Sequence, residues 1–283
     1  MKITVAVENS VAFPFNHGIC PGILGEHGLA LVLEMEGKKW LYDTGRGRAL
    51  LPNLKTLNIA PDEINGVVLS HAHLDHFGSL MDFLKARTKP VEVYMHREAF
   101  AKRYTRIGDL YRSVGLPWSE EELTDAGARL HLNTDPVCLA PGLWLTGGVA
   151  RINCFEQVEK KFFIDGENGE KQHDDILDDQ ALLVETDKGV IVLTGCAHAG
   201  VCNILEAAKK IFPGQRIRAV LGGLHLEGAP EARLHATAKY FKKQVMDTVA
   251  VGHCTGFKAC CLLAGELPGV FSPMNAGMVM EFD

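Results

Sequence analysis

Four side chains that commonly bind metal ions lie within six consecutive positions of this 283-residue chain. The surrounding segment reads GVVLSHAHLDHFG from Gly66 to Gly78, and its candidate ligands are His71, His73, Asp75 and His76. Neutral imidazole and carboxylate groups suit zinc and related divalent metals. Such a density of ligands directly after an apolar run indicates a metal site rather than a solvated loop that is rich in histidine by chance.

The spacing of these ligands indicates the local structure that must carry them. Residues i and i+2 point about 200° apart around a helix, so His71 and His73 could not share an ion there. The run Val67–Leu69 is short, apolar and β-branched, as in a buried strand. We therefore expect a strand that ends near Leu69, followed by a loop whose backbone curls around the ion.

Further side chains that could do chemistry follow three later apolar runs. They are Cys196, His198, His225 and His253. A thiolate binds zinc well, so Cys196 could be a ligand, or it could be a small buried thiol that packs beneath its loop. His225 follows a double glycine that permits close backbone approach. It could line a substrate pocket and polarise the substrate, or it could only shape its loop.

Short β-branched runs alternate with segments of helical spacing along the chain. The runs that predict strands are Ile3–Val7, Leu29–Met35, Trp40–Tyr42, Val67–Leu69, Val91–Met95, Leu143–Leu145, Ala181–Val184, Val190–Leu193, Ala219–Leu221, Val249–Val251 and Met278–Phe282. The segments that predict helices are Leu50–Leu57, Leu80–Leu84, Ile204–Ile211 and Pro230–Gln244. This alternation predicts a layered α/β protein.

The segment from about residue 97 to residue 178 is less regular, and we interpret it as an elaboration of a single domain that spans residues 1–283. Its first part, Arg97–Ser113, has the spacing of a helix. The basic residues of this part are Arg97, Lys102, Arg103, Arg106 and Arg112. They could receive a phosphate or carboxylate of a substrate, or form a solvated helix face. The predicted packing face of the same helix is Phe100, Tyr104, Ile107 and Leu110.

Composition narrows the classes of function. The chain is 47% hydrophobic and 23% charged, as in a globular protein, and its net charge of −6 argues against nucleic acid bound on a broad basic face. The longest uncharged stretch, Gly189–Leu205, is too short and too polar to span a bilayer. The first residues lack the pattern of a signal peptide, and eight cysteines then suggest a reducing compartment. We expect a cytoplasmic protein without a membrane partner.

The motif SHAHLDHFG resembles the HxHxDH signature of the metallo-β-lactamase superfamily. The run Leu41–Gly45, which ends in Asp-Thr-Gly, and the late Gly252-His253 pair resemble further motifs of that family in the same order. The resemblance implies a four-layer αββα sandwich. It also implies a dinuclear metal site at one edge of that sandwich, between the two sheets.

The resemblance implies a ligand set as well. The first metal ion would be bound by His71, His73 and His198, and the second by Asp75, His76 and His253. The ions are expected to be zinc, with iron and manganese as alternatives. Two such ions lower the pKa of a shared water and make it nucleophilic. Asp75 would hold this water and move its proton, while His225 would polarise the substrate.

At three positions the chain departs from the family pattern or leaves a role open. Cys196 stands where the family has an aspartate that bridges both ions, and it could act as a ligand in its place. The segment Gln172–Gln180 replaces the usual Pro-Gly-His-Thr turn, so His173 or an aspartate of that segment could approach the site. Asp43 could orient a histidine or fix the ligand loop, or form a turn, or do both.

Further motifs narrow the resemblance to a subgroup of metal-dependent hydrolases that includes the dihydropterin–ribofuranosylaminobenzene-phosphate synthases of methanopterin biosynthesis. These motifs are Glu26-His27-Gly28, Thr194–Gly200, Gly222–Leu226 and Gly252–Gly256. We expect a metal-dependent hydrolase of a small ester, lactone or phosphate-containing metabolite, with an anionic or phosphorylated small molecule as its partner. The alternatives are a pterin-type synthase and a catalytically silent, metal-bearing ligand sensor.

Overall fold

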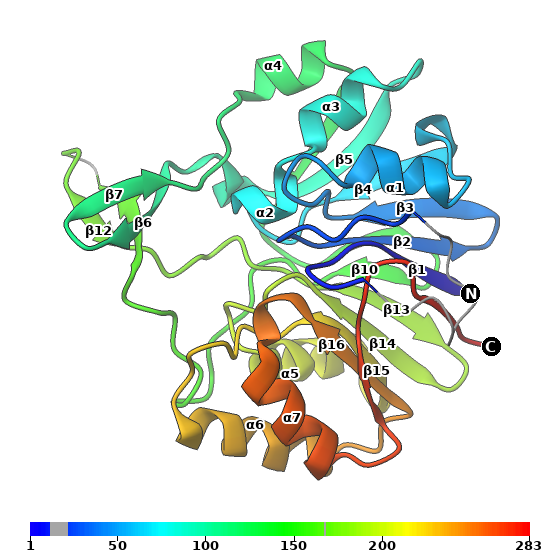
Figure 1. Cartoon of the computed structure of the whole chain (residues 1–283), viewed down its shortest axis with the longest axis vertical. Helices are drawn as coiled ribbons and strands as arrows, with labels where there is room; N and C mark the ends of the chain where they lie inside the picture. The colour runs from blue at the N-terminus through cyan, green and yellow to red at the C-terminus, as the bar shows by residue number, and fades with distance from the viewer. Residues whose placement is uncertain (12–21, 167) are drawn as a thin grey trace. The chain divides into compact units, whose positions relative to one another are not determined.

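The computed structural model describes residues 1–11, 22–166 and 168–283, which form two compact units (Figure 1). Unit 1 comprises Met1–Asn133, Glu159–Asp178 and Asn275–Asp283. Unit 2 comprises Thr134–Val158 and Asp179–Met274. Each unit is built around a seven-stranded sheet. None of the helices in the described part of the chain is long and apolar enough to cross a membrane.

The sheet of unit 1 has the strand order β18-β1-β2-β3-β4-β5-β8. Its strands are β1 (Lys2–Val7), β2 (Ala30–Met35), β3 (Lys38–Tyr42), β4 (Ile64–Val68), β5 (Val91–His96), β8 (Ala128–Asn133) and β18 (Val279–Glu281). The neighbours from β3 to β8 run parallel, so their carboxyl ends meet at one edge of the sheet. The loop that follows β4 at this edge carries the HxHxDH motif.

Helices cover the sheet of unit 1 through their apolar sides. They are α1 (Leu50–Thr56), α2 (Leu74–Phe77), α3 (Leu80–Lys85) and α4 (Glu120–Asp125), with a short 3-10 helix η1 (Pro61–Glu63) before β4. Leu54 of α1 and Phe83 of α3 are fully buried in one core with Val67 of β4 and Val93 of β5. This packing fixes the carboxyl end of β4, where the motif begins.

Within the predicted elaboration, unit 1 forms a separate four-stranded sheet and not the predicted helix, whereas Ala128–Asn133 joins its main sheet as β8 and Thr134–Val158 belongs to unit 2. The order of the four-stranded sheet is β12-β11-β6-β7, with β6 (Arg103–Ile107), β7 (Leu110–Ser113), β11 (Phe162–Asp165) and β12 (Lys171–His173). Only Arg97–Phe100 is helical, as the 3-10 helix η2. The helix prediction over Arg97–Ser113 is therefore wrong, and so is its packing face, since Ile107 is 59% and Leu110 is 76% exposed.

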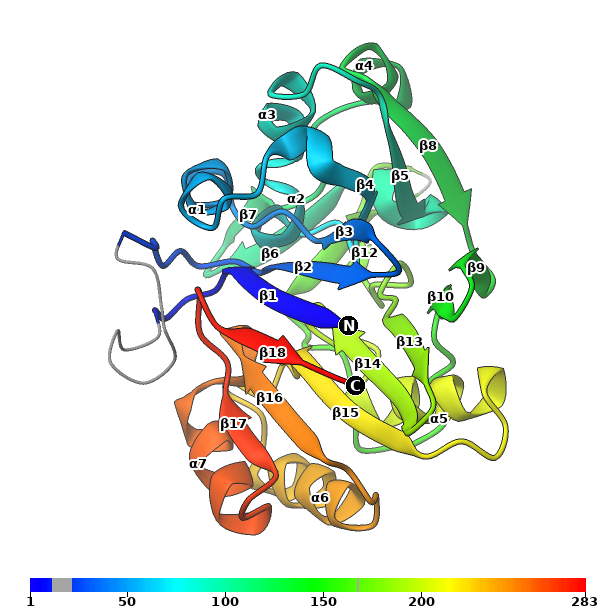
Figure 2. The same cartoon turned by 90° about the vertical axis from the view of Figure 1, so that its right-hand side faces the viewer.

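The sheet of unit 2 has the strand order β17-β16-β15-β14-β13-β10-β9 (Figure 2). Its strands are β9 (Val137–Ala140), β10 (Leu143–Leu145), β13 (Leu182–Thr186), β14 (Gly189–Thr194), β15 (Ile217–Gly223), β16 (Thr248–Gly252) and β17 (Phe271–Pro273). The helices α5 (Val201–Ile211), α6 (Glu231–Lys242) and α7 (Phe257–Glu266) connect the four parallel strands from β14 to β17. The ends of these strands carry the other candidate ligands.

Both units follow the predicted alternation. Each of the eleven predicted strands corresponds to an observed strand, and the four helices predicted outside the elaboration correspond to α1, α3, α5 and α6. The core of unit 2 joins Leu205 and Phe241 of the helices to Val192 and Val220 of the strands. Apolar spacing at a period of two or 3.6 residues was therefore sufficient to find the strands that precede the ligands, although it did not predict the short helix α2.

Candidate metal centre

The HxHxDH segment joins β4 to α2 in unit 1. Strand β4 ends at Val68, close to the predicted end, and the following loop carries His71 and His73. Helix α2 begins at Leu74, so that Asp75 and His76 lie in its first turn. The three histidine side chains are buried, whereas the Asp75 side chain is 18% exposed. The segment therefore carries three buried imidazoles and one carboxylate that reaches solvent, and its second half is a short helix where only a loop was expected.

The geometry of His71 and His73 fits a shared metal ion. Nε2 of His71 lies 3.1 Å from Nδ1 of His73. Two imidazole nitrogens on one tetrahedral zinc ion, each at its usual bond length, lie about 3.3 Å apart. The pKa of His71 lies well below its ordinary value because the ring is buried and because the adjacent His76 and His73 disfavour another positive charge. His71 is therefore neutral, as a metal ligand must be.

Asp43 orients His76 and holds the start of the ligand loop. Its Oδ1 accepts the backbone N–H of Ser70 at 2.7 Å, and its Oδ2 lies 2.7 Å from both the Ser70 hydroxyl and Nδ1 of His76. The Ser70 hydroxyl in turn lies 2.9 Å from Nδ1 of His71. Both Nδ1 atoms are thus engaged by protein groups, which directs Nε2 of each ring toward an ion. The expectation that Asp43 orients a histidine and fixes the loop is confirmed.

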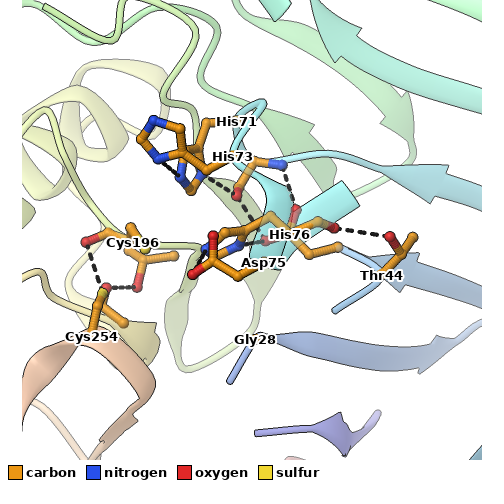
Figure 3. A network of polar contacts seen from close by, with 12 residues as sticks. Gly28, Thr44, His71, His73, Asp75, His76, Cys196 and Cys254 are labelled. Atoms are coloured by element: carbon orange, nitrogen blue, oxygen red, sulfur yellow. Dashed lines mark hydrogen bonds and ion pairs between the residues drawn. The ribbon is translucent and has the colours of Figure 1, made fainter. Parts of the chain in front are cut away.

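Two residues of the Glu26-His27 motif support the same loop, although the sequence alone gave them no role. The Glu26 carboxylate accepts the backbone N–H groups of four consecutive residues, Arg46 to Ala49. Thr44 of the same turn donates its N–H and its hydroxyl to the carbonyl oxygen of His76 (Figure 3). Nε2 of His27 lies 3.2 Å from Oδ2 of Asp75, and this hydrogen bond raises the pKa of His27.

A buried ion-pair network reaches the ligand loop from the elaboration. The backbone N–H of Ala72, between the two histidines, donates to Oδ2 of Asp178 at 2.7 Å. Nη2 of Arg103 lies 2.8 Å from the other oxygen of Asp178, and Nη1 lies 2.7 Å from Asp174. Burial raises the pKa of Asp178, while Arg103 and the Ala72 N–H oppose this effect. Arg103 is therefore neither a substrate-binding group nor part of a solvated face, as the helix prediction had allowed.

The segment Gln172–Gln180 approaches the ligand loop through an aspartate, which was one of the two alternatives. Asp178 makes that contact. His173 does not, because it is exposed on β12 and lies 3.6 Å from Asp175. The next residue in the chain, Asp179, belongs to unit 2 and accepts the backbone N–H of Ala199 at 2.7 Å.

In unit 2 the remaining candidate site residues follow the carboxyl ends of three parallel strands. Cys196 and His198 follow β14, His225 follows β15, and His253 follows β16. Ala197, His225 and His253 have positive φ angles of 58°, 46° and 51°. Residues other than glycine seldom adopt this conformation, and strained residues cluster at functional sites. The strain therefore marks the same edge of the sheet as the ligands do.

The side chains at this edge lie close together. The ring centroids of His198 and His225 are 4.1 Å apart. Metal-binding atoms of Cys196, His225 and Cys254 all lie within 4.8 Å of one another. Burial alone would raise the pKa of the Cys254 thiol, but a hydrogen bond with Cys196 and the nearby His253 and His225 bring it well below its ordinary value. From the sequence, Cys254 was recognised only as part of the Gly252–Gly256 motif.

The structure thus places the predicted ligands, together with the predicted catalytic residue His225, in two sets. Unit 1 holds His71, His73, Asp75 and His76, and unit 2 holds Cys196, His198, His225 and His253. Within each set the residue types are nitrogen, oxygen and sulfur donors suited to zinc. That residues of both sets share ions stays a prediction.

Comparisons with known proteins agree with this architecture. The sequence profile of the Metallo-beta-lactamase superfamily matches residues 24–214. A protein of Methanocaldococcus jannaschii named 7,8-dihydropterin-6-methyl-4-(beta-D-ribofuranosyl)-aminobenzene-5'-phosphate synthase is 32% identical over 266 residues, which cover 91% of this chain and 90% of that protein. An uncharacterized protein of the same organism is 31% identical over 240 residues, which cover 84% of this chain and 88% of that protein.

Solved structures extend the likeness to the fold. The crystal structure of a metal-dependent hydrolase of the beta-lactamase superfamily has a TM-score of 0.84 and 28% identity, covering 100% of this chain and 99% of that one. Zn(2+)-bound PqqB from Methylobacterium extorquens has a TM-score of 0.58 at 12% identity over the whole of both chains, which shows likeness of fold alone. The predicted fold class, α/β of the metallo-β-lactamase type, is confirmed, and the chain belongs to the metallo-β-lactamase superfamily.

Proposed function

We propose that this chain is a metal-dependent hydrolase that binds two divalent metal ions, with zinc as the expected metal. The first ion would be held by His71, His73 and His198, and the second by Asp75, His76 and His253, with Cys196 as the candidate for the family's bridging position. The observation that supports this proposal most is the buried His71–His73 pair, whose facing nitrogens are 3.1 Å apart. The Asp43–His76 contact supports it as well, because it turns Nε2 of His76 away from the protein partner.

The chain's own residues have distinct roles in this reaction. When bound, the ions would supply a water of lowered pKa and would polarise the substrate. Asp75 would hold that water and accept its proton, since its carboxylate reaches solvent. His27, 3.2 Å from Asp75 and 58% exposed, would carry the proton on to solvent. His225 would donate a hydrogen bond to the substrate oxygen on which negative charge develops.

The proposed substrate is a small ester, lactone or phosphate-containing metabolite. A second candidate function is a pterin-type synthase, and the observation that favours it is the 32% identity over nine-tenths of the chain to a relative with that name. The two functions differ in the group that attacks the substrate. In a hydrolase it is water, whereas a synthase joins two organic substrates and consumes no water at the bond that forms.

The test reconstitutes metal-free protein with zinc and measures turnover of aryl esters, lactones and phosphodiesters in isotope-labelled water. The proposal expects label in the acid or phosphate product without a second organic substrate. Replacing His71 and His73 together with alanine should abolish both metal uptake and turnover. The matched control is His235→Ala, because this histidine is 62% exposed on α6 and should be dispensable. Turnover retained by the double variant would contradict the proposal, and product formed only with two organic substrates would favour the synthase.

A further inference from the structure

Two thiols and one imidazole, all groups that bind zinc, occupy equivalent positions after three neighbouring strands of unit 2. Strands β14, β15 and β16 end at Thr194, Gly223 and Gly252. Each candidate ligand is the second residue after its strand, and the three are Cys196, His225 and Cys254. The strands are parallel neighbours, with Thr194 paired to Gly222 and Gly223 paired to Gly252. The three strands end within one residue of the same level, so equal offsets bring the three residues to one edge of the sheet.

The distances suit a single ion. The metal-binding atoms of Cys196, His225 and Cys254 lie within 4.8 Å of one another. On a tetrahedral zinc ion two thiolate sulfurs would lie about 3.8 Å apart. Side-chain rotations that move the ligand atoms by roughly an ångström would therefore complete the tetrahedral geometry without movement of the strands.

The backbone around the Cys254 sulfur is shaped to receive it. The sulfur accepts the backbone N–H of His225 at 3.3 Å, a contact that stabilises a thiolate. A Cβ atom at Gly223 would lie 2.6 Å from this sulfur and 2.5 Å from the carbonyl oxygen of Gly195, too close for any side chain. Gly223 thus leaves the space that lets Cys254 reach Cys196 (Figure 3).

We infer that Cys196, Cys254 and His225 bind a thiophilic divalent ion of their own, such as zinc, within unit 2. Two thiolates and one imidazole select soft or borderline metals over magnesium, calcium or manganese. Three protein ligands leave the fourth tetrahedral position for water or a substrate atom, as in catalytic rather than structural zinc sites. The inference departs from the proposed function at two residues: it assigns Cys196 to this ion instead of the bridging position, and His225 to this ion instead of the substrate oxygen.

Cobalt(II) is the probe that reports on the ligands themselves. Added to metal-free full-length protein, it should produce sulfur-to-cobalt charge-transfer absorption in the near ultraviolet. Cys254→Ser and Cys196→Ser should each reduce this band by about half, because each of the two thiolates contributes equally to the sulfur-to-cobalt absorption. Cys202→Ser is the matched control, since Cys202 is buried like Cys196 but lies in α5, and it should leave the band unchanged.

A second measurement needs no variant. Zinc should protect Cys196 and Cys254 of the wild-type protein from alkylation, and mass spectrometry of the peptides would identify them. A band that survives Cys254→Ser at full strength, or alkylation of Cys254 that zinc does not slow, would overturn the inference. Cobalt bound with ligand-field bands but no sulfur band would overturn it while leaving the proposed function intact. No uptake of metal at all would overturn both.

Discussion

Asp178→Ala should both destabilise the fold and weaken metal binding by the HxHxDH loop. Asp178 is fully buried and contacts the Arg103 guanidinium at 2.8 Å and the Ala72 N–H at 2.7 Å. Loss of the charge-assisted contact costs about 1.5–3 kcal/mol, and an N–H left without an acceptor costs about 1–3 kcal/mol. Asp174 still pairs with Arg103, so we expect a decrease of about 3 kcal/mol in the free energy of unfolding.

Asp178→Asn separates the two contributions. The asparagine keeps an oxygen for the Ala72 N–H and removes only the negative charge, so its expected cost is about 2 kcal/mol. Both costs are smaller than the roughly 5–15 kcal/mol that stabilises a typical domain, so both variants should fold. The two variants differ in whether residue 178 still accepts the backbone N–H of Ala72, which lies between His71 and His73.

Urea denaturation measures the stability of both variants, and competition with a chelator measures their zinc affinity. Because Ala72 lies between two ligands, Asp178→Ala should lower affinity by about 10–100-fold, as loss of a group that orients ligands does. Asp178→Asn should lower it much less. Asp62→Asn is a matched control, since this aspartate bonds Thr88 on the exposed surface. Equal loss of affinity in Asp178→Ala and Asp178→Asn would refute the positional argument, and unchanged affinity in both would do so more strongly.

Asp43→Ala should lower zinc affinity by about 10–100-fold, because His76 loses the oxygen that orients it. Competition with a chelator measures this loss, and unchanged affinity would contradict the role of Asp43. Glu26→Ala removes the acceptor of four backbone N–H groups, some of them accessible to water, and should cost about 2–3 kcal/mol in urea denaturation, whereas a loss within error would contradict it. Arg216 lowers the pKa of Asp247 below its ordinary 3.8, so this pair stabilises the fold above that pH and loses its effect as the pH falls through the lowered pKa. Asp247 is 43% exposed, so Asp247→Asn should cost only about 0.5 kcal/mol near neutral pH and nothing in strong acid; a constant difference across pH would be inconsistent with the pair.

The strands and helices that carry ligands were predictable because their signal is local. Alternation or helical spacing within one run identified β4, β14, β15 and β16, and the ligands follow these strands by a few residues. Cys196, His198 and His253 were proposed as ligands from the family resemblance together with that position. Their conformation could not be predicted, because the positive φ of His253 depends on how the strand ends meet.

The elaboration could not be predicted because its structure depends on a distant partner. Strand β6 pairs with β11, so that Arg103 faces Ile164. No local sequence pattern reveals a partner about sixty residues away. Arg103 looked like one of several basic residues on a helix, yet it is buried between two aspartates. Pairings of this kind appear only when the tertiary structure is known.

The supporting residues of the site were missed for the same reason. Glu26 and His27 were recognised only as part of a motif, since Glu26 acts on a turn twenty residues later. Asp178 was one of several aspartates in its segment, and its partner, Ala72, contributes only a backbone N–H. Nearly every residue has a backbone N–H, so the sequence does not show which of them donates to a buried side chain. A single sequence therefore reveals ligands more readily than the groups that orient them.

The measurement that tests the central claim most directly is the zinc content of the wild-type protein and of the His71→Ala/His73→Ala variant after dialysis against the same free zinc concentration. The account predicts that the wild type retains stoichiometric zinc and that the variant retains at least one ion fewer per chain while remaining folded. Equal zinc content in the two proteins, or no stoichiometric zinc in the wild type, would contradict it.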